Sequence, residues 1–561
     1  MTNAITGATG FDRVLGRHLR TGSTICAIAA CAILSTAEAQ MRGKVYDLPL
    51  FANDLAPGER FYTSDHADND TQRFGYDITG QRLSDGKWTS LKPGVTSDAH
   101  WANPKNSNYF VFGKPFYAMK DGTVIACWRN APQNPRPMRN EEDNNGPVEE
   151  KGWIHQDLKD GLMPGGGNML WILHDDGTRA LYAHAQTGSI PASLCPKSAT
   201  KYSSVPDKSK VDENGMYAPI ALPPNQRKRV VAGQKLGLIG HSGSSTGPHI
   251  HIHVERKNPN GNWVADPMLF RRGMSTPWKG NNTDINKWTS FSGQPITKGN
   301  VLFWPPTRLG REYARHHGDT GSFQRLFDHL ANSGFRPKII NGYNVGGTVF
   351  LNHVWEPSNS AWRAFFGQSQ GAHQTNLDKA KRDGFAPVFI DSYLQSGQVR
   401  YAAVYVKNKP GNWLLRSNLT EQQHQSVLDE AKAKGLKPTS VSVVSRGQRL
   451  YTALYRADGI GSWTLKSQIA ESNYQGTVNA ELAAGRVPIY LDGYMHQGTP
   501  YYSAIFASKH AGKTKARHAM STSGYQNEIQ AAWNAGMVTQ SVTAFDGAQS
   551  QHRYGAVWVR P

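Results

Sequence analysis

The chain has 561 residues, a formal net charge of +19, and 56 Gly and 31 Pro. At ~150 residues per domain this length indicates several domains, and the 15 Trp, 22 Tyr and 20 Phe supply apolar surface for packed cores. The composition excludes a collagen, a coiled coil, a polytopic membrane protein and a largely disordered chain. The positive charge favours a polyanionic partner, which is nucleic acid, anionic lipid or an acidic cell-wall polymer.

The first 39 residues have the three regions of an export signal. A basic region with three Arg spans residues 13–20, an apolar stretch spans residues 25–34, and residues 37–39 read Ala-Glu-Ala, a typical cleavage site. The apolar stretch is too short to span a membrane, and we also expect no transmembrane helix in the mature chain. We predict a signal peptide at residues 1–39 and a periplasmic or extracellular protein. Lipid anchoring at Cys31, within a lipobox-like Ile-Ala-Ala-Cys, is the lesser alternative.

Export to the cell envelope narrows the choice of anionic partner and bears on the redox state of the cysteines. An exported basic protein meets envelope polymers rather than chromosomal DNA, so we expect peptidoglycan or another anionic envelope polymer as partner and no nucleic acid. The mature chain holds only Cys127 and Cys195, an even number in an oxidising compartment. A structural disulfide between them and two unpaired buried thiols are the two alternatives.

Four regions follow the leader. Residues 40–112 mix turns with short strands, and residues 113–272 alternate apolar runs with Gly-rich turns, which predicts antiparallel β structure. Residues 273–320 are rich in Gly, Asn, Ser, Thr and Pro and are predicted as a linker. Residues 321–561 are an internal repeat.

The repeat region is predicted as five units of about 50 residues. A Gly recurs in each unit with spacings of 50 or 51: Gly334, Gly384, Gly435, Gly485 and Gly536. Before the first Gly, the spacing of Phe323, Leu326, Phe327 and Leu330 places four apolar side chains on one helix face. The Gly suits a left-handed residue that ends the helix, and two extended runs follow it. One helix-strand-strand unit cannot bury its apolar face alone, so we expect the five to stack or curl into one array.

These units resemble a bacterial tandem repeat that also occurs in the non-catalytic half of fungal polyglycine hydrolases. The resemblance covers residues 321–561 and implies a module appended to hydrolases. With the export signal and the positive charge, we expect this module to hold the protein to the envelope.

The residues best suited to catalysis or metal binding lie where a Gly- and Ser-rich turn leads into the run His-Ile-His-Ile-His at residues 249–253. Because side chains of a strand alternate, His249, His251 and His253 share one face, and the two Ile face the core. Neighbouring His on that face lie about 6.6–7 Å apart along the strand. This spacing suits two imidazoles that serve one reaction centre, one on a metal and one on substrate.

The segment around this run resembles the signature of lysostaphin-like zinc metallopeptidases. The resemblance is carried by residues 231–251 and by three pieces in the expected order, at residues 74–78, 113–124 and 167–184. It implies a peptidase domain at residues 40–272, with a core at 113–272 and the segment of Asp77 upstream. The predicted fold class is therefore α+β, an antiparallel β-rich metallopeptidase-like domain followed by the five repeats.

The resemblance implies a role for each of four residues. Asp77 and His251 match zinc ligands, and His184 and His249 match the catalytic pair. Bound Zn²⁺ polarises the scissile carbonyl and lowers the pKa of a bound water to about 7. One His takes the proton of that water and the other donates to the oxyanion. The implied function is hydrolysis of peptide bonds in bacterial cell-wall peptidoglycan by a zinc metalloendopeptidase.

One position departs from the family pattern. The pattern His-x-Gly-x-Asp here begins with Arg73, whose guanidinium cannot ligate zinc, and catalytic zinc normally takes three protein ligands. His253 is our candidate for the replacement ligand because it shares a face with His251, and His66 is another. The alternative is a degenerate, metal-free protein that binds wall peptide or regulates another hydrolase with the same groove.

Overall fold

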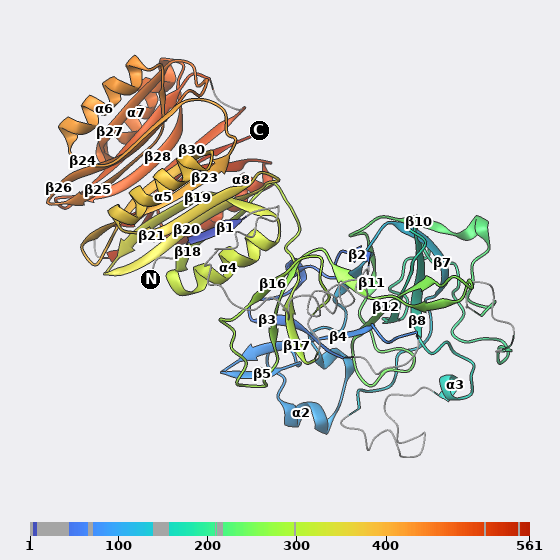
Figure 1. Cartoon of the computed structure of the whole chain (residues 1–561). Helices are drawn as coiled ribbons and strands as arrows, with labels where there is room; N and C mark the ends of the chain where they lie inside the picture. Colours follow the sequence, from blue (N-terminus) through green and yellow to red (C-terminus); the bar gives the residue numbers. More distant parts are fainter. Residues whose placement is uncertain are drawn as a thin grey trace, which may run out of the picture. The chain divides into compact units, whose positions relative to one another are not determined.

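The computed structural model describes residues 4–7, 44–65, 71–138, 156–207, 209, 217–296, 299–509, 512–547 and 550–560. Apart from β1 (Ala4–Gly7), the predicted signal peptide lies outside these residues, and so does His66. The chain forms two compact units, Arg17–Arg308 and Leu309–Pro561 with Met1–Gly16 (Figure 1). Within the described ranges, no helix is both long and apolar enough to cross a membrane.

The unit that ends at Arg308 is built on a twelve-stranded antiparallel sheet. Ten strands follow the order β10-β7-β8-β9-β12-β4-β3-β17-β15-β16, while β13 pairs with β12 and β5 with β4. Their bounds are β3 (Glu59–Asp65), β4 (Tyr76–Ser84), β5 (Lys87–Thr89), β7 (Gly122–Trp128), β8 (Asn168–His174), β9 (Arg179–Ala185), β10 (Lys228–Val230), β12 (Ile250–Lys257), β13 (Trp263–Ala265), β15 (Gly273–Pro277), β16 (Thr289–Phe291) and β17 (Val301–Trp304).

Smaller elements complete this unit. They are the antiparallel pair β6 (Pro115–Tyr117) and β11 (Lys235–Leu238), the parallel pair β2 (Lys44–Tyr46) and β14 (Met268–Phe270), and the helices α2 (Ser97–Ala102) and α3 (Gln156–Lys159). Among the described residues, three short 3-10 helices lie at Ala52–Asp54, Asn106–Asn108 and Pro224–Gln226. The helices are short and few among the described residues, so the sheet carries the unit and positions its side chains.

The prediction of a linker at residues 273–320 is wrong, because the segment forms strands of both units. Its first part supplies β15, β16 and β17, which pair within the large sheet, where Phe291 and Phe303 join the core. Its last part forms β18 (Tyr313–Asp319), a strand of the first repeat. Polar and turn-forming residues dominate this composition, but the few apolar side chains are spaced for short strands and are buried by partners distant in sequence.

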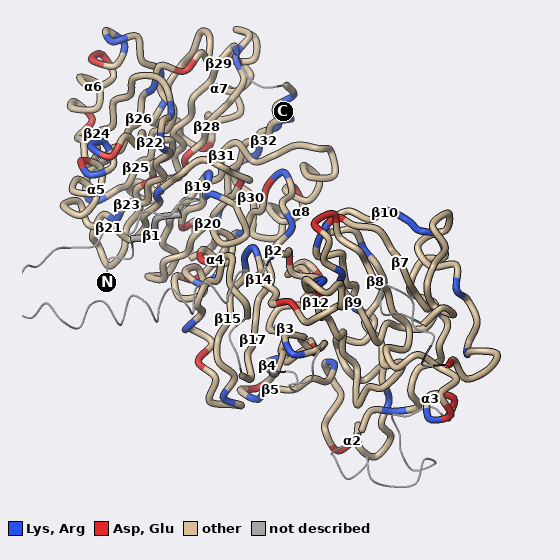
Figure 2. Tube along the Cα trace, turned by 45° about the vertical axis from the view of Figure 1, so that its right-hand side comes forward, with Lys and Arg blue, Asp and Glu red and all other residues tan. Residues whose placement is uncertain are grey.

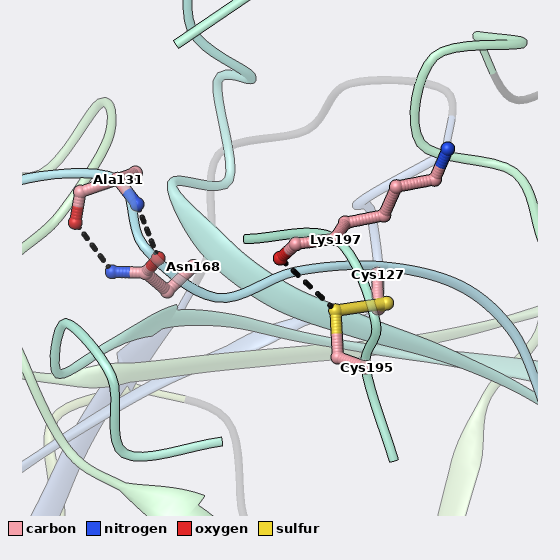
Figure 3. The surroundings of a disulfide bond; sticks show 5 residues. All are labelled: Cys127, Ala131, Asn168, Cys195 and Lys197. Carbon is pink, nitrogen blue, oxygen red and sulfur yellow. Dashed lines mark hydrogen bonds between the residues drawn. A yellow bond between two sulfur atoms is a disulfide. The ribbon is translucent and has the colours of Figure 1, made fainter. Parts of the chain in front are cut away.

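The core of this unit lies on the face of β12 that points away from the His side chains. Ile250, Ile252 and Val254 are at most 1% exposed and pack in the main apolar cluster. Cys127 and Cys195 join the same cluster and form a disulfide with a Cα–Cα distance of 5.7 Å (Figure 3). Nearby, Asn168 exchanges hydrogen bonds with both backbone groups of Ala131.

The second unit consists of the five repeats, each with one more strand than the sequence predicted. A strand precedes the helix, so each unit reads strand-helix-strand-strand, and its three strands form a sheet in the order first, third, second. The bounds are β18, α4 (Thr320–Asn332), β19 (Phe335–Val345) and β20 (Thr348–Pro357); β21 (Trp362–Gln368), α5 (Gln370–Arg382), β22 (Phe385–Gln395) and β23 (Gln398–Lys407); β24 (Trp413–Leu419), α6 (Glu421–Ala433), β25 (Lys437–Arg446) and β26 (Gln448–Arg456); β27 (Trp463–Ala470), α7 (Glu471–Ala483), β28 (Val487–His496) and β29 (Thr499–Ala507); and β30 (Thr514–Met520), α8 (Thr522–Asn534), β31 (Val538–Asp546) and β32 (His552–Val559).

The local expectations for the repeats are met. Each recurrent Gly that follows a helix has a positive φ, from 68° at Gly435 to 94° at Gly334, as a left-handed helix end requires. On α4, the side chains of Phe323, Phe327 and Leu330 are buried, and they pack against strands of both the first and second repeats. The helix face therefore joins one repeat to the next. β1 adds an antiparallel edge strand beside β21.

The five repeats close into a ring around their second strands, β19, β22, β25, β28 and β31. One polar side chain per repeat, at the same position of that strand, accepts a hydrogen bond from the backbone N–H of the neighbouring repeat. The five bonds are Gly342 to Asp391, Ser392 to Ser442, Val443 to Asp492, Gly493 to Thr543, and Ala544 to Asn341, with donor–acceptor distances from 2.7 to 3.1 Å. The last bond joins the fifth repeat to the first, so the array curls on itself and closes.

Candidate active site

The His-bearing face of β12 lies between β9 and β4, which supply the other residues of the site. Asp77 on β4 is the direct cross-strand partner of His251, and the Nδ1 of His251 lies 2.7 Å from the Oδ1 of Asp77. The Nε2 of His249 lies 3.5 Å from the same oxygen. Asp77 is 42% exposed and His251 only 5%, so the carboxylate sits where the site opens to solvent.

His184 on β9 faces His249, with the ring centroids 4.7 Å apart. Each imidazole is oriented by a backbone carbonyl, because the Nδ1 of His184 donates to the oxygen of Ser242 and the Nδ1 of His249 donates to that of Gly247, both at 2.8 Å. The Nε2 of each ring is therefore left to face the site. His184 has a φ of +69°, a conformation that costs energy in a residue other than Gly and that concentrates at functional sites.

The two histidines have pKa values shifted in opposite directions. Burial lowers the pKa of His184 well below its usual range, and the charges of His249 and His251 lower it further. Burial also opposes the charged form of His249, but the Asp77 carboxylate outweighs it and raises the pKa of His249. For Asp77, partial burial raises the pKa, yet the charge of His249 and hydrogen bonds from His249 and His251 hold it well below its usual range. His184 is thus neutral where His249 tends to be protonated.

A row of buried polar side chains continues along β12 beyond His251. The Nε2 of His251 lies 2.8 Å from the Nδ1 of His253, and the Nε2 of His253 lies 3.5 Å from a carboxylate oxygen of Glu255. Glu255 in turn accepts a 2.6 Å hydrogen bond from the Nε of Arg179, its cross-strand partner on β9. The row fixes the ring orientation of His251 from the side opposite Asp77.

The Arg179 end of this row lines a cavity of about 560 Å³. The guanidinium lies over the rings of Trp171 and Trp263, 4.5 and 4.1 Å from their centroids, and both side chains line the cavity together with His253 and Glu255. The candidate site therefore extends along the strand from His249 to a hollow walled by two indoles.

The residues present do not complete a three-ligand zinc site. Asp77 and His251 bring an oxygen and a nitrogen together, as the resemblance implies. Arg73 is exposed and lies against the ring of Phe74. His253 contacts the Nε2 of His251, whereas Asp77 contacts the Nδ1, and the two nitrogens of an imidazole point away from each other, so one ion cannot take Asp77, His251 and His253 together. Among the described residues, no group of three or more His, Cys, Asp or Glu is arranged to hold a metal ion.

Five of these side chains were identified from the sequence, but the groups that hydrogen-bond to them and orient them were not. The structure brings Asp77, His184, His249 and His251 into one group and places His253 at its edge. The carbonyls of Ser242 and Gly247 and the Arg179–Glu255 pair were not found. Glu255 carried a usable signal, since it continues the alternate positions of the His run, but a carbonyl has no signature in a sequence.

Comparison with known proteins gives separate matches for the two parts of the chain. Residues 310–358, 359–408, 410–457, 461–509 and 511–561 match the family model described as "Polyglycine hydrolase-like, structural repeat". The predicted repeats are thereby confirmed, with a start near residue 310 rather than 321. No curated protein matches the chain.

The search of solved structures returned the peptidases that the sequence motifs resemble. The catalytic domain of the antimicrobial peptidase lysostaphin from Staphylococcus simulans is 15% identical, with 38% of this chain and 91% of that chain covered and a TM-score of 0.16. A zinc-containing peptidase from Vibrio cholerae is 16% identical, with coverages of 32% and 46% and a TM-score of 0.13. The catalytic domain of a prophage-encoded M23 protein from Enterococcus faecalis is 19% identical, with coverages of 36% and 93% and a TM-score of 0.11. At these TM-scores the likeness carries no argument about the site, which rests on its own geometry.

Proposed function

We propose that this protein is an exported hydrolase that cleaves peptide bonds of bacterial cell-wall peptidoglycan. The observation that carries the proposal is the group of His184, His249, His251 and Asp77, which three different strands bring together in one partly open site. Histidines whose environments displace their pKa values in opposite directions form an acid–base pair. Such a pair is what hydrolysis of an amide requires.

The proton transfers can be assigned to atoms. His184 is neutral, and because its Nδ1 donates to the Ser242 carbonyl, its Nε2 has the free lone pair of a general base. His249, charged beside Asp77, offers an Nε2–H that can donate to an oxyanion or to the leaving amine. His251 holds Asp77 in place from the other side. The cavity beyond His253 gives the substrate room along the strand.

In this proposal Asp77 and His251 would be ligands of zinc, and the described residues supply no third donor beside them. When bound, zinc supplies Lewis acidity for the scissile carbonyl. A specific observation favours the second candidate function as well: with Arg73 in place of the first ligand, a metal-free groove that binds wall peptide without cleaving it is consistent with the geometry.

Metal content and wall lysis of the same preparation separate the two functions. We expect release of soluble fragments from purified peptidoglycan, which Asp77→Ala should reduce, and less than one equivalent of zinc per mature chain, because the described side chains supply only two ligands. His184→Ala should abolish lysis while zinc content stays. His317→Ala is the matched control, because His317 is exposed and lies in the repeats. Substoichiometric zinc with no lysis by the wild type, but retained peptide binding, would establish the metal-free function instead.

The repeats are proposed to hold the protein to the anionic envelope. Lys and Arg are distributed over the elements of both units (Figure 2), and the chain carries a net charge of +19. Such attraction is screened within about 8 Å at physiological salt. Sedimentation with purified walls should therefore fall several-fold between 50 mM and 500 mM NaCl; binding that does not change with salt contradicts the electrostatic role.

A further inference from the structure

The closed ring of repeats has a cavity of about 800 Å³ at the ends of its inner strands, where all five repeats contribute to the wall. One residue from each repeat illustrates this: Asn341, Ser392, Val443, Asp492 and Ala544. The cavity exists only because the fifth repeat bonds back to the first. It lies wholly within the second unit, so it is separate from the candidate active site.

The wall of this cavity carries acidic side chains, whereas the protein as a whole is basic. Asp492 and Asp546 line it, and neither Lys, Arg nor His occurs among the described residues of its wall, although the chain as a whole is strongly basic. Burial raises the pKa of Asp492 well above its usual range, and the nearby carboxyl of Asp391 adds to this. A positive group in the cavity would relieve both costs.

Asp546 lines the cavity and is partly exposed, and the described residues use only part of its acceptor capacity. One of its oxygens, Oδ2, accepts a 3.2 Å hydrogen bond from the backbone N–H of Gly346. The other oxygen, Oδ1, is buried and has no hydrogen-bond partner among the described residues. A buried carboxylate oxygen without a donor is costly, and the residue lies in the wall of a cavity large enough for a ligand.

The rest of the wall suits an alkyl chain. Leu394, Met495, Val444 and Phe545 supply apolar surface beside the carboxylate. A bare divalent cation would leave this apolar surface without contacts. Ca²⁺ also requires about six to eight oxygen ligands. An alkylammonium ion uses both features, since its nitrogen donates to the carboxylate and its methylene groups cover the apolar wall.

We propose that the cavity at the centre of the repeat ring binds ligands that carry a primary alkylammonium group, with Asp546 as the main acceptor. The ring is then a receptor for amine-bearing molecules in addition to a basic surface. This inference does not depend on hydrolysis by the other unit.

Calorimetric titration of the full mature chain tests the proposal with Nα-acetyl-lysine N-methylamide as the probe, at 150 mM NaCl. We expect saturable one-site binding. The norleucine analogue, which lacks only the ammonium group, should bind at least about tenfold more weakly, because one charge-assisted hydrogen bond is lost. Asp546→Asn should weaken binding of the lysine probe by a similar factor, since it keeps the acceptor for Gly346 and removes the charge.

The matched control is Asp429→Asn, an exposed carboxylate on α6 outside the cavity, which should leave the affinity unchanged. Thermal unfolding and the hydrolysis assay, run on the same variants, show whether Asp546→Asn keeps the fold. Absence of saturable binding overturns the proposal. Equal affinity for both analogues, an unchanged affinity in Asp546→Asn, or stronger binding of N-acetylglucosamine or Ca²⁺ overturns it too. Failure of hydrolysis with intact amine binding would reject the proposed function alone.

Discussion

At the scale of single residues, His184 and His249 show how neighbours divide two identical side chains into different chemical roles. Burial keeps His184 neutral, whereas Asp77 favours the charged form of His249. The same physics acts in the repeats, where buried carboxyls line up near the axis of the ring. Asp391 is 2% exposed and accepts hydrogen bonds from Asn341 and Gly342 of the first repeat.

Stability of the repeats is expected to fall as pH rises because of Asp391. Burial raises the pKa of its carboxyl to about 7. The pKa of Asp in the unfolded chain is about 4. Between about pH 4 and about pH 7 the folded state therefore holds a proton that the unfolded state has lost, and each rise in pH favours unfolding. We expect the unfolding temperature of the repeat unit to decrease as pH rises across this window, and Asp492, whose pKa is also raised by burial and by Asp391, extends the decrease above it.

Asp391→Asn tests this assignment, because Asn imitates the protonated carboxyl. Differential scanning calorimetry from pH 4 to pH 8 should show a much smaller slope for the variant. Asp378→Asn, an exposed position on α5, should keep the slope of the wild type. An unchanged slope in Asp391→Asn would show that another group titrates.

Removing one partner of the buried ion pair between Arg179 and Glu255 is expected to lower the free energy of unfolding more than replacing both partners with apolar residues. Their side chains are 3% and 4% exposed. Glu255→Gln leaves the charge of Arg179 buried beside the two Trp rings, so the free energy of unfolding should drop by about 3–5 kcal/mol. Urea unfolding of the double variant Arg179→Met/Glu255→Leu should recover most of that loss.

An exposed pair gives the comparison for this experiment. Arg229 and Asp175 form a salt bridge at the surface of the same unit, with side chains 52% and 56% exposed. Asp175→Asn should leave the unfolding midpoint nearly unchanged. If Glu255→Gln behaves like Asp175→Asn, the buried row along β12 does not stabilise the fold.

At the scale of elements, the junction between neighbouring repeats is the sensitive contact. Gly342 on β19 lies under the ring of Tyr393 from the next repeat, and a Cβ at Gly342 would lie 2.2 Å from a ring carbon. We expect Gly342→Ala to push the two strands apart and to lower the unfolding free energy by about 1–3 kcal/mol.

Gly371 provides the matched substitution. It lies near the start of α5 with open space around its Cα, so Gly371→Ala should be neutral or stabilising by less than about 1 kcal/mol. Chemical unfolding of both variants measures the difference. Equal effects of the two substitutions would contradict close packing between the repeats.

At the scale of the whole molecule, closure of the ring predicts that the repeats are not independent. Without residues 511–561, the first repeat loses the hydrogen bond between Ala544 and Asn341, and β19 and β28 lose the strand between them. An open array of four should expose apolar surface and unfold broadly, or associate. Circular dichroism melting and gel filtration check this: a monomeric chain ending at residue 509 with a sharp transition would contradict closure.

The sequence predicted local features and missed contacts between distant segments. The helix face with Phe323, the left-handed Gly at helix ends and the two faces of the His strand follow from periods of 3.6 and 2 residues, and the structure has all three. The strand before each helix was missed, and so were β15 to β17 in the predicted linker. Their short runs become strands only through partners elsewhere in the chain.

The sequence alone determined that the chain has a histidine strand with His249, His251 and His253 on one face, a separate set of five repeats, and a strongly positive charge. Tertiary structure decided which groups act together. It placed Asp77 across from His251, turned His253 to the other side of that ring, and bent the five repeats into a ring with an acidic cavity. Sheet pairing and ring closure join residues far apart in the chain, and no local pattern records those distances.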